Sequence, residues 1–152
     1  MRVKNVAAPP SSAAGHPRPG LFRRLAAIVY DSLLLFTVLF FATALAILVN
    51  GGHAIRPPNP FLTSYLFIVS FFFFAGFWIH GGQTLGMRAW RIRVQRYDGL
   101  PITWWQALLR FLTAIVSWLA LGAGFWWILI DGKKLAWHDR YSETELVNVP
   151  RQ

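Results

Sequence analysis

Two long apolar runs limit what this chain can fold into more than any other feature. The first extends from Leu25 to Val49 with Asp31 as its single charged residue, and the second extends from Phe61 to Ile79. A helix needs about 20 apolar residues to cross a bilayer, so each run predicts a membrane span. Charged residues make up 14% of the chain, well below the roughly 25% typical of soluble domains. We therefore expect a multi-pass integral membrane protein whose first partner is the lipid bilayer.

A third apolar stretch, from Trp104 to Ile130, allows two arrangements. Thr103-Trp104-Trp105-Gln106 has the spacing of a capping box that opens a helix. The stretch is then either one tilted span or a hairpin of two short segments broken at Gly122-Ala123-Gly124. The hairpin returns the C-terminal basic residues to the N-terminal side and leaves Arg56 alone on the other, which the positive-inside rule favours. We predict the hairpin, with both termini cytoplasmic and the protein in the inner (cytoplasmic) membrane.

The segment between the second and third runs is polar and basic. Apolar and polar residues alternate from Trp90 to Gln95, which is the period of a strand, and Asp98-Gly99 is a strong turn signal. These patterns predict a small cytoplasmic β-hairpin with Leu100-Pro101-Ile102 as its return strand and a further pairing with a last strand near Glu145 to Val149. The expected fold is thus an all-α membrane protein, a small transmembrane helical bundle with a small β-hairpin.

Composition restricts the domain organisation and the partners. Residues 1–20 contain no apolar run long enough for a secretory signal, so we expect a disordered cytoplasmic tail before a single transmembrane domain at residues 21–149. The net charge of +9 comes from basic residues between the apolar runs. Anionic lipid headgroups explain this placement better than nucleic acid does. The chain has no cysteine, which excludes disulfides and thiolate chemistry.

Asp31 is the first candidate for a functional residue. A carboxylate inside a span is costly, by about 2.5–3.5 kcal/mol on translocon scales. Arg24 lies seven residues earlier, so both side chains project from one face of the helix, with Ala27 between them allowing close packing. Three interpretations stay open: an internal ion pair that locks helix packing, a proton or cation site, and a topology signal.

Arg110 and the C-terminal polar run supply the other candidates. A buried Arg110 requires an anion such as Asp31 or Asp139, whereas an interfacial one reaches the headgroups. His138, Asp139 and Arg140 lie together at the membrane edge, but the adjacent histidine and aspartate diverge on a helix. Gly82-Gln83-Thr84-Leu85-Gly86 lacks the lysine of a phosphate loop, and no metal-ligand spacing or nucleophile motif is present. We therefore predict no enzymatic activity, no metal site and no cofactor.

Four short segments in this order resemble the RDD family of small membrane proteins, which is named for one arginine and two aspartates. They are Arg24-Leu25 with Asp31-Ser32-Leu33, Gly82-Gln83-Thr84-Leu85-Gly86, Ala107-Leu108-Leu109-Arg110, and His138-Asp139-Arg140 followed by Thr144 and Leu146-Val147. The resemblance covers about residues 21 to 149 and departs from the family at Met87 and Glu143. It implies that Arg24, Asp31 and Asp139 are the residues of the family's name.

The resemblance implies transport, as exchange of monovalent cations for protons. Arg24, Asp31, Arg110 and Asp139 would form the charged cluster, with His138, Arg140, Gln83 and Thr84 as secondary residues. Asp31 would alternate between protonated and ion-bound states, and so few spans would require a homo-oligomer or a membrane-protein partner to enclose a pathway. The alternative is a structural or accessory membrane protein. In that case the cluster stabilises the bundle, and the basic face docks partners or anionic lipids.

Overall fold

The structure is a computed structural model in which residues 18–120, 122–130 and 135–150 are described. In chain order the elements are α1 (Leu21–Val49), α2 (Pro60–Gly81), α3 (Leu85–Ala89), β1 (Ile92–Arg96), α4 (Trp104–Leu119), α5 (Ala123–Ile130), α6 (Trp137–Tyr141) and β2 (Thr144–Asn148). The described part is mostly helical, with a two-stranded sheet. The expected disordered tail lies outside the described residues up to residue 17.

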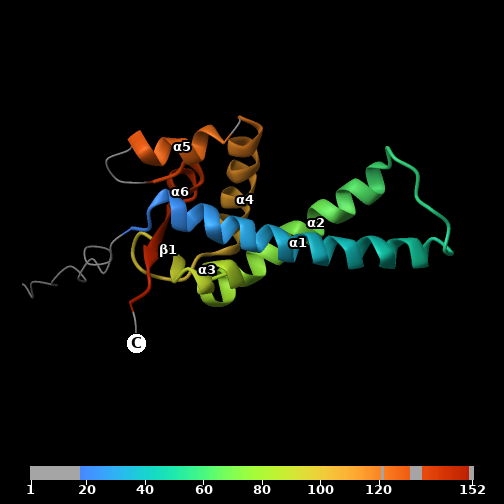
Figure 1. Cartoon of the computed structure of the whole chain (residues 1–152), viewed down its shortest axis with the longest axis horizontal. Helices are drawn as coiled ribbons and strands as arrows, with labels where there is room; N and C mark the ends of the chain where they lie inside the picture. Colours follow the sequence, from blue (N-terminus) through green and yellow to red (C-terminus); the bar gives the residue numbers. More distant parts are fainter. Residues whose placement is uncertain (1–17, 121, 131–134, 151–152) are drawn as a thin grey trace, which may run out of the picture.

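Helices α1 and α2 contain the two predicted spans. They have 29 and 22 residues, which correspond to about 44 and 33 Å at ~1.5 Å per residue. The Asn59 side chain caps α2 by accepting the Leu62 amide at 2.9 Å. Gly82 ends the helix in the left-handed region, with φ of 68°. The two helices separate toward the loop that joins them, and the shorter elements gather at the opposite end (Figure 1).

The two long helices are apolar on their outside. Within their most hydrophobic windows, only 6% of α1 and 11% of α2 is buried, whereas the core helix of a soluble protein would be mostly buried. The buried positions of α1 include Arg24 and Asp31, while large side chains such as Phe36 and Phe40 are exposed. Contiguous apolar surface with charges inside fits a lipid environment. By length and composition both helices can cross a membrane.

The predicted β-hairpin is wrong in its pairing. The Asp98-Gly99 turn forms, with the Arg96 amide bonded to the Leu100 carbonyl at 3.0 Å, but residues 100–102 form no strand. Strand β1 instead pairs antiparallel with β2, and this bears out the expected strand near the C-terminus. The other edge of β1 is used by the loop after α2, because the Val94 amide donates to the Gly82 carbonyl. Pro101 also has no amide to donate to a ladder.

The third apolar stretch is two helices, so a single continuous span is wrong. The capping box at the start of α4 is confirmed, since the Thr103 amide donates to Gln106 and the Gln106 amide to the Thr103 hydroxyl, at 3.1 and 3.3 Å. Helix α4 ends at Leu119, and the Gly122 amide donates to the Ser117 carbonyl. With φ of 76°, Gly122 takes a conformation that favours glycine and turns the chain into α5. Figure 1 shows α4 running across the direction of α1.

The C-terminal elements return to the beginning of α1. Helix α6 packs against α4, and β2 joins the sheet beside β1. Arg18 and Glu145 form an ion pair at 2.8 Å, and Arg23 donates to the Asn148 side chain at 3.3 Å. The core therefore lies at this end of the molecule and consists of Ala27, Ala75, Trp78, Met87, Ile92, Val94, Ile102, Ala107, Phe111 and Leu146.

Candidate functional site

Asp139 lies at the centre of a buried ionic triad. Arg24 Nη1 donates to its Oδ2 at 2.6 Å, and Arg110 Nη1 donates to its Oδ1 at 2.5 Å. The side chains of Arg24, Arg110 and Asp139 are 2%, 3% and 0% exposed, so both arginines have exchanged water for the same carboxylate. The three residues come from α1, α4 and α6, and the triad therefore joins the start, middle and end of the described chain.

Neutral groups add further hydrogen bonds to the triad, although Arg110 Nε is buried without a hydrogen-bond partner among the described residues. The Ala136 amide donates to Asp139 Oδ2 at 3.2 Å, and Arg110 Nη1 also donates to the Thr144 hydroxyl at 2.9 Å. Arg24 Nε donates to the Pro19 carbonyl at 3.3 Å. Buried charges are tolerated when they are paired and hydrogen-bonded in this way.

Asp31 fastens α1 to the short helix α3. Its Oδ2 accepts the Thr84 hydroxyl at 2.5 Å, and its Oδ1 accepts the Gly86 amide at 2.9 Å. Gly86 permits this approach because a Cβ there would meet the Ala27 carbonyl and lie 2.8 Å from Asp31 Oδ1. Asp31 is 4% exposed. We call this contact of Asp31 with Thr84 and Gly86 the α1–α3 clip.

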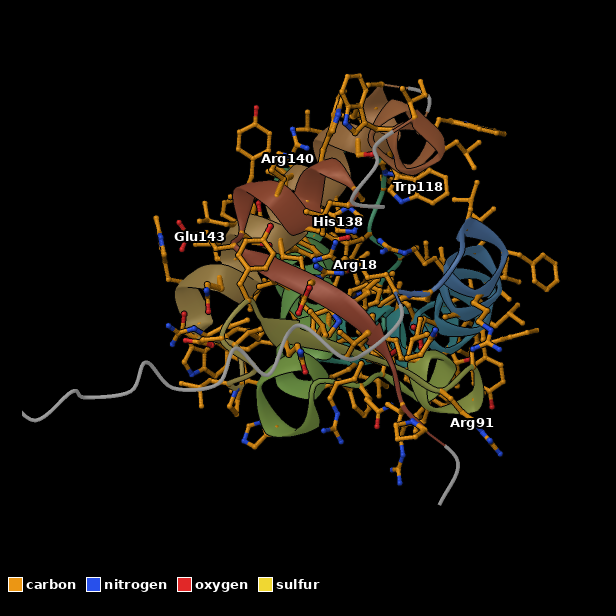
Figure 2. The ribbon with its side chains drawn as sticks, turned by 90° about the vertical axis from the view of Figure 1, so that its left-hand side faces the viewer. Arg18, Arg91, Trp118, His138, Arg140 and Glu143 are labelled. Atoms are coloured by element: carbon orange, nitrogen blue, oxygen red, sulfur yellow. The ribbon has the colours of Figure 1, made fainter. Side chains whose placement is uncertain are left out.

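A cavity of about 250 Å³ lies between the triad and the clip. Its polar lining includes Arg24, Asp31, Arg110 and His138, so the structure brings three of the four predicted cluster residues, and one secondary residue, to one space. The other walls are apolar and come mainly from Leu35, Phe74, Trp78, Phe111, Ile115 and Trp118. Figure 2 shows Trp118 and His138 near each other above the strand.

Comparison with protein-family models adds a decisive observation to this geometry. The model of the RDD family matches residues 18–143, which include the triad, the clip and both long helices. The chain belongs to the RDD family. The search of curated proteins and the search of solved structures gave no match. Together with the two apolar helices, family membership supports a membrane protein.

The two aspartates of the RDD pattern have different environments. Burial by itself raises the pKa of Asp139, but the charges of Arg110 and Arg24 outweigh it and hold that pKa well below its usual range. Asp139 is therefore a permanent counterion for both arginines. Asp31 accepts uncharged donors, a hydroxyl and an amide. With Asp31 ionised, the charges of the two arginines and two aspartates sum to zero.

His138 stays neutral beside the triad. Burial is the largest cause that lowers its pKa to about 3; Asp139 opposes the shift, and Arg110 and Arg24 add to it. Its Nε2 lies 3.5 Å from Asp139 Oδ1. The neighbouring Arg140 is exposed on the outer side of α6, whereas His138 faces inward (Figure 2). The sequence predicted that the adjacent His138 and Asp139 diverge on a helix, and this is wrong, because both side chains are buried and approach each other to 3.5 Å.

The remaining candidates have supporting contacts. Gln83 donates to the Ile92 carbonyl at 2.7 Å and so ties the loop after α2 to β1. Thr84 both holds Asp31 and caps α3, accepting the Met87 amide at 3.1 Å. Among the described residues, no group of three or more histidines and acids is placed to hold a metal ion.

Sequence reasoning missed two buried polar residues in β2. Thr144 is 0% exposed and its hydroxyl accepts a hydrogen bond from Arg110. Glu145 is 1% exposed and forms an ion pair with Arg18. The signal for Glu145 was present, because an acid in the middle of a short strand needs a partner when both faces are covered. Four consecutive residues of β2 are buried, beginning at Thr144, so alternation did not reveal which of them face the core.

Proposed function

We propose that this RDD protein is a structural or accessory membrane protein. Its ionic triad fixes the bundle, and its basic end docks anionic lipids or a protein partner. The observation that carries the proposal is the closure of the triad: Asp139 accepts from Arg24, Arg110 and the Ala136 amide, and all of these groups are buried. A carboxylate so committed to two fixed cations favours a scaffold over a site that binds and releases an ion.

The α1–α3 clip agrees with a scaffold role. Both oxygens of Asp31 accept from N–H or O–H donors, and these donors belong to the turn that begins α3. A monovalent cation that bound here would compete with the Thr84 hydroxyl and the Gly86 amide for the oxygens of Asp31. The clip therefore works as a hydrogen-bonded fastening between two helices.

The orientation follows from the basic residues. Arg56 lies in the loop between α1 and α2, and a larger group lies at the opposite end of those helices: Arg18, Arg23, Arg88, Arg91, Arg93, Arg96 and Arg140. The positive-inside rule assigns that larger group to the cytoplasmic side of the inner membrane. In this arrangement the sheet, α3 and α6 lie at the cytoplasmic surface, and both described ends of the chain are cytoplasmic.

A second candidate is exchange of a monovalent cation for a proton, and the cavity favours it. Asp31 lines that space together with Arg24 and Arg110, so a change in its charge would be felt by both arginines. The described part of the chain contains two helices long enough to span a membrane. Exchange therefore requires further copies of the chain, or a partner, to enclose a pathway.

Sodium-driven proton flux in proteoliposomes distinguishes the two functions. Wild type is compared with Asp31→Asn and with Asp98→Asn, a control that removes an exposed carboxylate, at matched amounts of folded protein. The scaffold proposal expects no flux in any sample and a less stable Asp31→Asn. Flux in wild type and Asp98→Asn that disappears in a folded Asp31→Asn would refute it and establish Asp31 as a transport carboxylate.

A further inference from the structure

A wide groove of about 620 Å³ lies at the end of α2, apart from the triad and its cavity. One wall follows the last turns of α2 and is largely aromatic, and the other side carries polar and basic residues. The lining consists of Phe72, Phe73, Gly76, Phe77, His80, Gly81, Gln83, Arg88 and Arg93. The groove thus changes from apolar to cationic along its length.

The charge of the groove is not balanced within it. Arg88 in α3 and Arg93 in β1 are both exposed, and neither forms an ion pair with any residue of the described chain. Other arginines nearby do have carboxylate partners, since Arg18 binds Glu145 and Arg96 binds Asp98. No acid lines the groove. The two guanidinium groups are therefore available to an external anion.

The apolar wall lies where a lipid would approach. Phe73 and Phe77 belong to a helix that is long and apolar enough to cross a membrane. Phe73 precedes Gly81, the last residue of α2, by about 12 Å along the axis at ~1.5 Å per residue. If α2 spans the bilayer, this wall contacts the upper part of an acyl chain, and the arginines beyond the helix end lie at headgroup depth.

We propose that this groove binds one anionic phospholipid, with its phosphate between Arg88 and Arg93 and the start of an acyl chain against the aromatic wall of α2. Arginine recognises phosphate through paired N–H donors, and two arginines from different elements define a place for it. The proposal rests on the proposed function, because it names the anionic lipid that the basic end docks.

The groove fits a lipid better than a free phosphate. A soluble phosphate would use the arginines and leave the apolar wall uncovered, whereas a phospholipid covers both. Glycine at position 76 keeps the wall open, since a Cβ there would have nothing within 4 Å. A side chain added at this position therefore begins in open space on the groove side of α2.

Binding is measured on the full-length protein in a neutral detergent, by titrating phosphatidylglycerol or phosphatidylcholine and following the midpoint of thermal unfolding. Wild type should bind phosphatidylglycerol more tightly than phosphatidylcholine. Arg88→Gln/Arg93→Gln should weaken the binding of phosphatidylglycerol by about thirtyfold, the scale expected for losing two arginine–headgroup attractions. The matched control Arg56→Gln/Arg91→Gln removes the same charge outside the groove, where Figure 2 shows Arg91 projecting outward, and should retain the preference.

A second variant tests the lipid tail. Gly76→Leu keeps both arginines and fills the apolar part of the groove. It should therefore weaken the binding of phosphatidylglycerol, while any shift of the unfolding midpoint caused by glycerol phosphate should stay unchanged. The proposal is overturned if wild type binds the two lipids with equal affinity, or if both double variants lose the same affinity for phosphatidylglycerol. It is also overturned if glycerol phosphate alone shifts the unfolding midpoint as much as phosphatidylglycerol does. Asp31-dependent flux with lipid preference intact would refute the scaffold function alone, because Asp31 does not line the groove.

Discussion

Removing the charge of Asp139 tests the ionic triad most directly. Asp139→Asn keeps the size of the side chain but leaves Arg24 and Arg110 buried without their shared anion. The new amide oxygen can accept from one arginine, while the amide nitrogen faces a donor. Breaking a buried charge pair typically costs about 3–5 kcal/mol. Since a domain's whole stability is about 5–15 kcal/mol, we expect a large loss of folded protein.

The assay is reversible unfolding in mixed detergent, followed by tryptophan fluorescence. Asp98→Asn is the matched control, because Asp98 pairs with Arg96 at 2.9 Å while 46% of its own side chain and 37% of its partner's is exposed. A surface pair of this kind contributes about 0–1 kcal/mol. Asp139→Asn should therefore lower the free energy of unfolding by several times as much as the control does.

A third variant separates the charge from the packing. Replacing the whole triad, as Arg24→Met/Arg110→Met/Asp139→Leu, removes every buried charge at once. Because apolar replacement of a complete buried ion network is often neutral or stabilising, this protein should be more stable than Asp139→Asn. The reasoning is refuted if Asp139→Asn lies within about 1 kcal/mol of wild type, the size of a surface pair.

Two further predictions concern the clip and the histidine. Gly86→Ala should destabilise the protein by about 1–3 kcal/mol, because the added Cβ meets Ala27 and Asp31. The control Gly81→Ala should not, because its added Cβ meets nothing within 4 Å. Equal unfolding midpoints for the two variants would contradict this prediction. The depressed pKa of His138 makes the unfolded chain bind the extra proton, so stability is complete above pH 6.5 and falls toward pH 3. The loss should be roughly 1 kcal/mol per pH unit. In His138→Gln the slope of unfolding free energy over that window should be shallower, and an unchanged slope would assign the acid sensitivity elsewhere.

Local patterns predicted the parts of the fold that depend on neighbouring residues. The apolar runs predicted α1 and α2, and the Thr103–Gln106 spacing predicted the start of α4. The break predicted at Gly122-Ala123-Gly124 falls at its first residue, because α5 already begins at Ala123. Each of these depends on residues within one or two turns. The predicted β-hairpin was wrong because two segments could pair with β1. The strand that does pair with it, β2, lies some fifty residues further along the chain. Sequence spacing favours the nearer strand and carries no information about which edge the loop after α2 occupies.

The same distinction explains the result for the charged residues. Helical spacing placed Arg24 and Asp31 on one buried face of α1, and both are buried there. It suggested that they pair, but the carboxylate that binds Arg24 belongs to Asp139, and the donors to Asp31 belong to Thr84 and Gly86. A face of a helix follows from local periodicity, while the partner on that face depends on how distant segments return.

The separation of polar and apolar contacts along α1 follows from the cost of burying charge in a membrane. Arg24 and Asp31 lie in its first three turns, where α3, α4 and α6 supply partners, and beyond them the helix exposes mainly apolar side chains. A partner lost at the polar end leaves a charge that neither lipid nor water can solvate. Two separate fastenings therefore share one helix end: Asp139 neutralises the arginines, and Asp31 holds the turn after α2. Arg24 and Arg110 of the triad and Asp31 of the clip line the same cavity. In a scaffold, loss of the triad or loss of the clip should therefore loosen the walls of this one cavity.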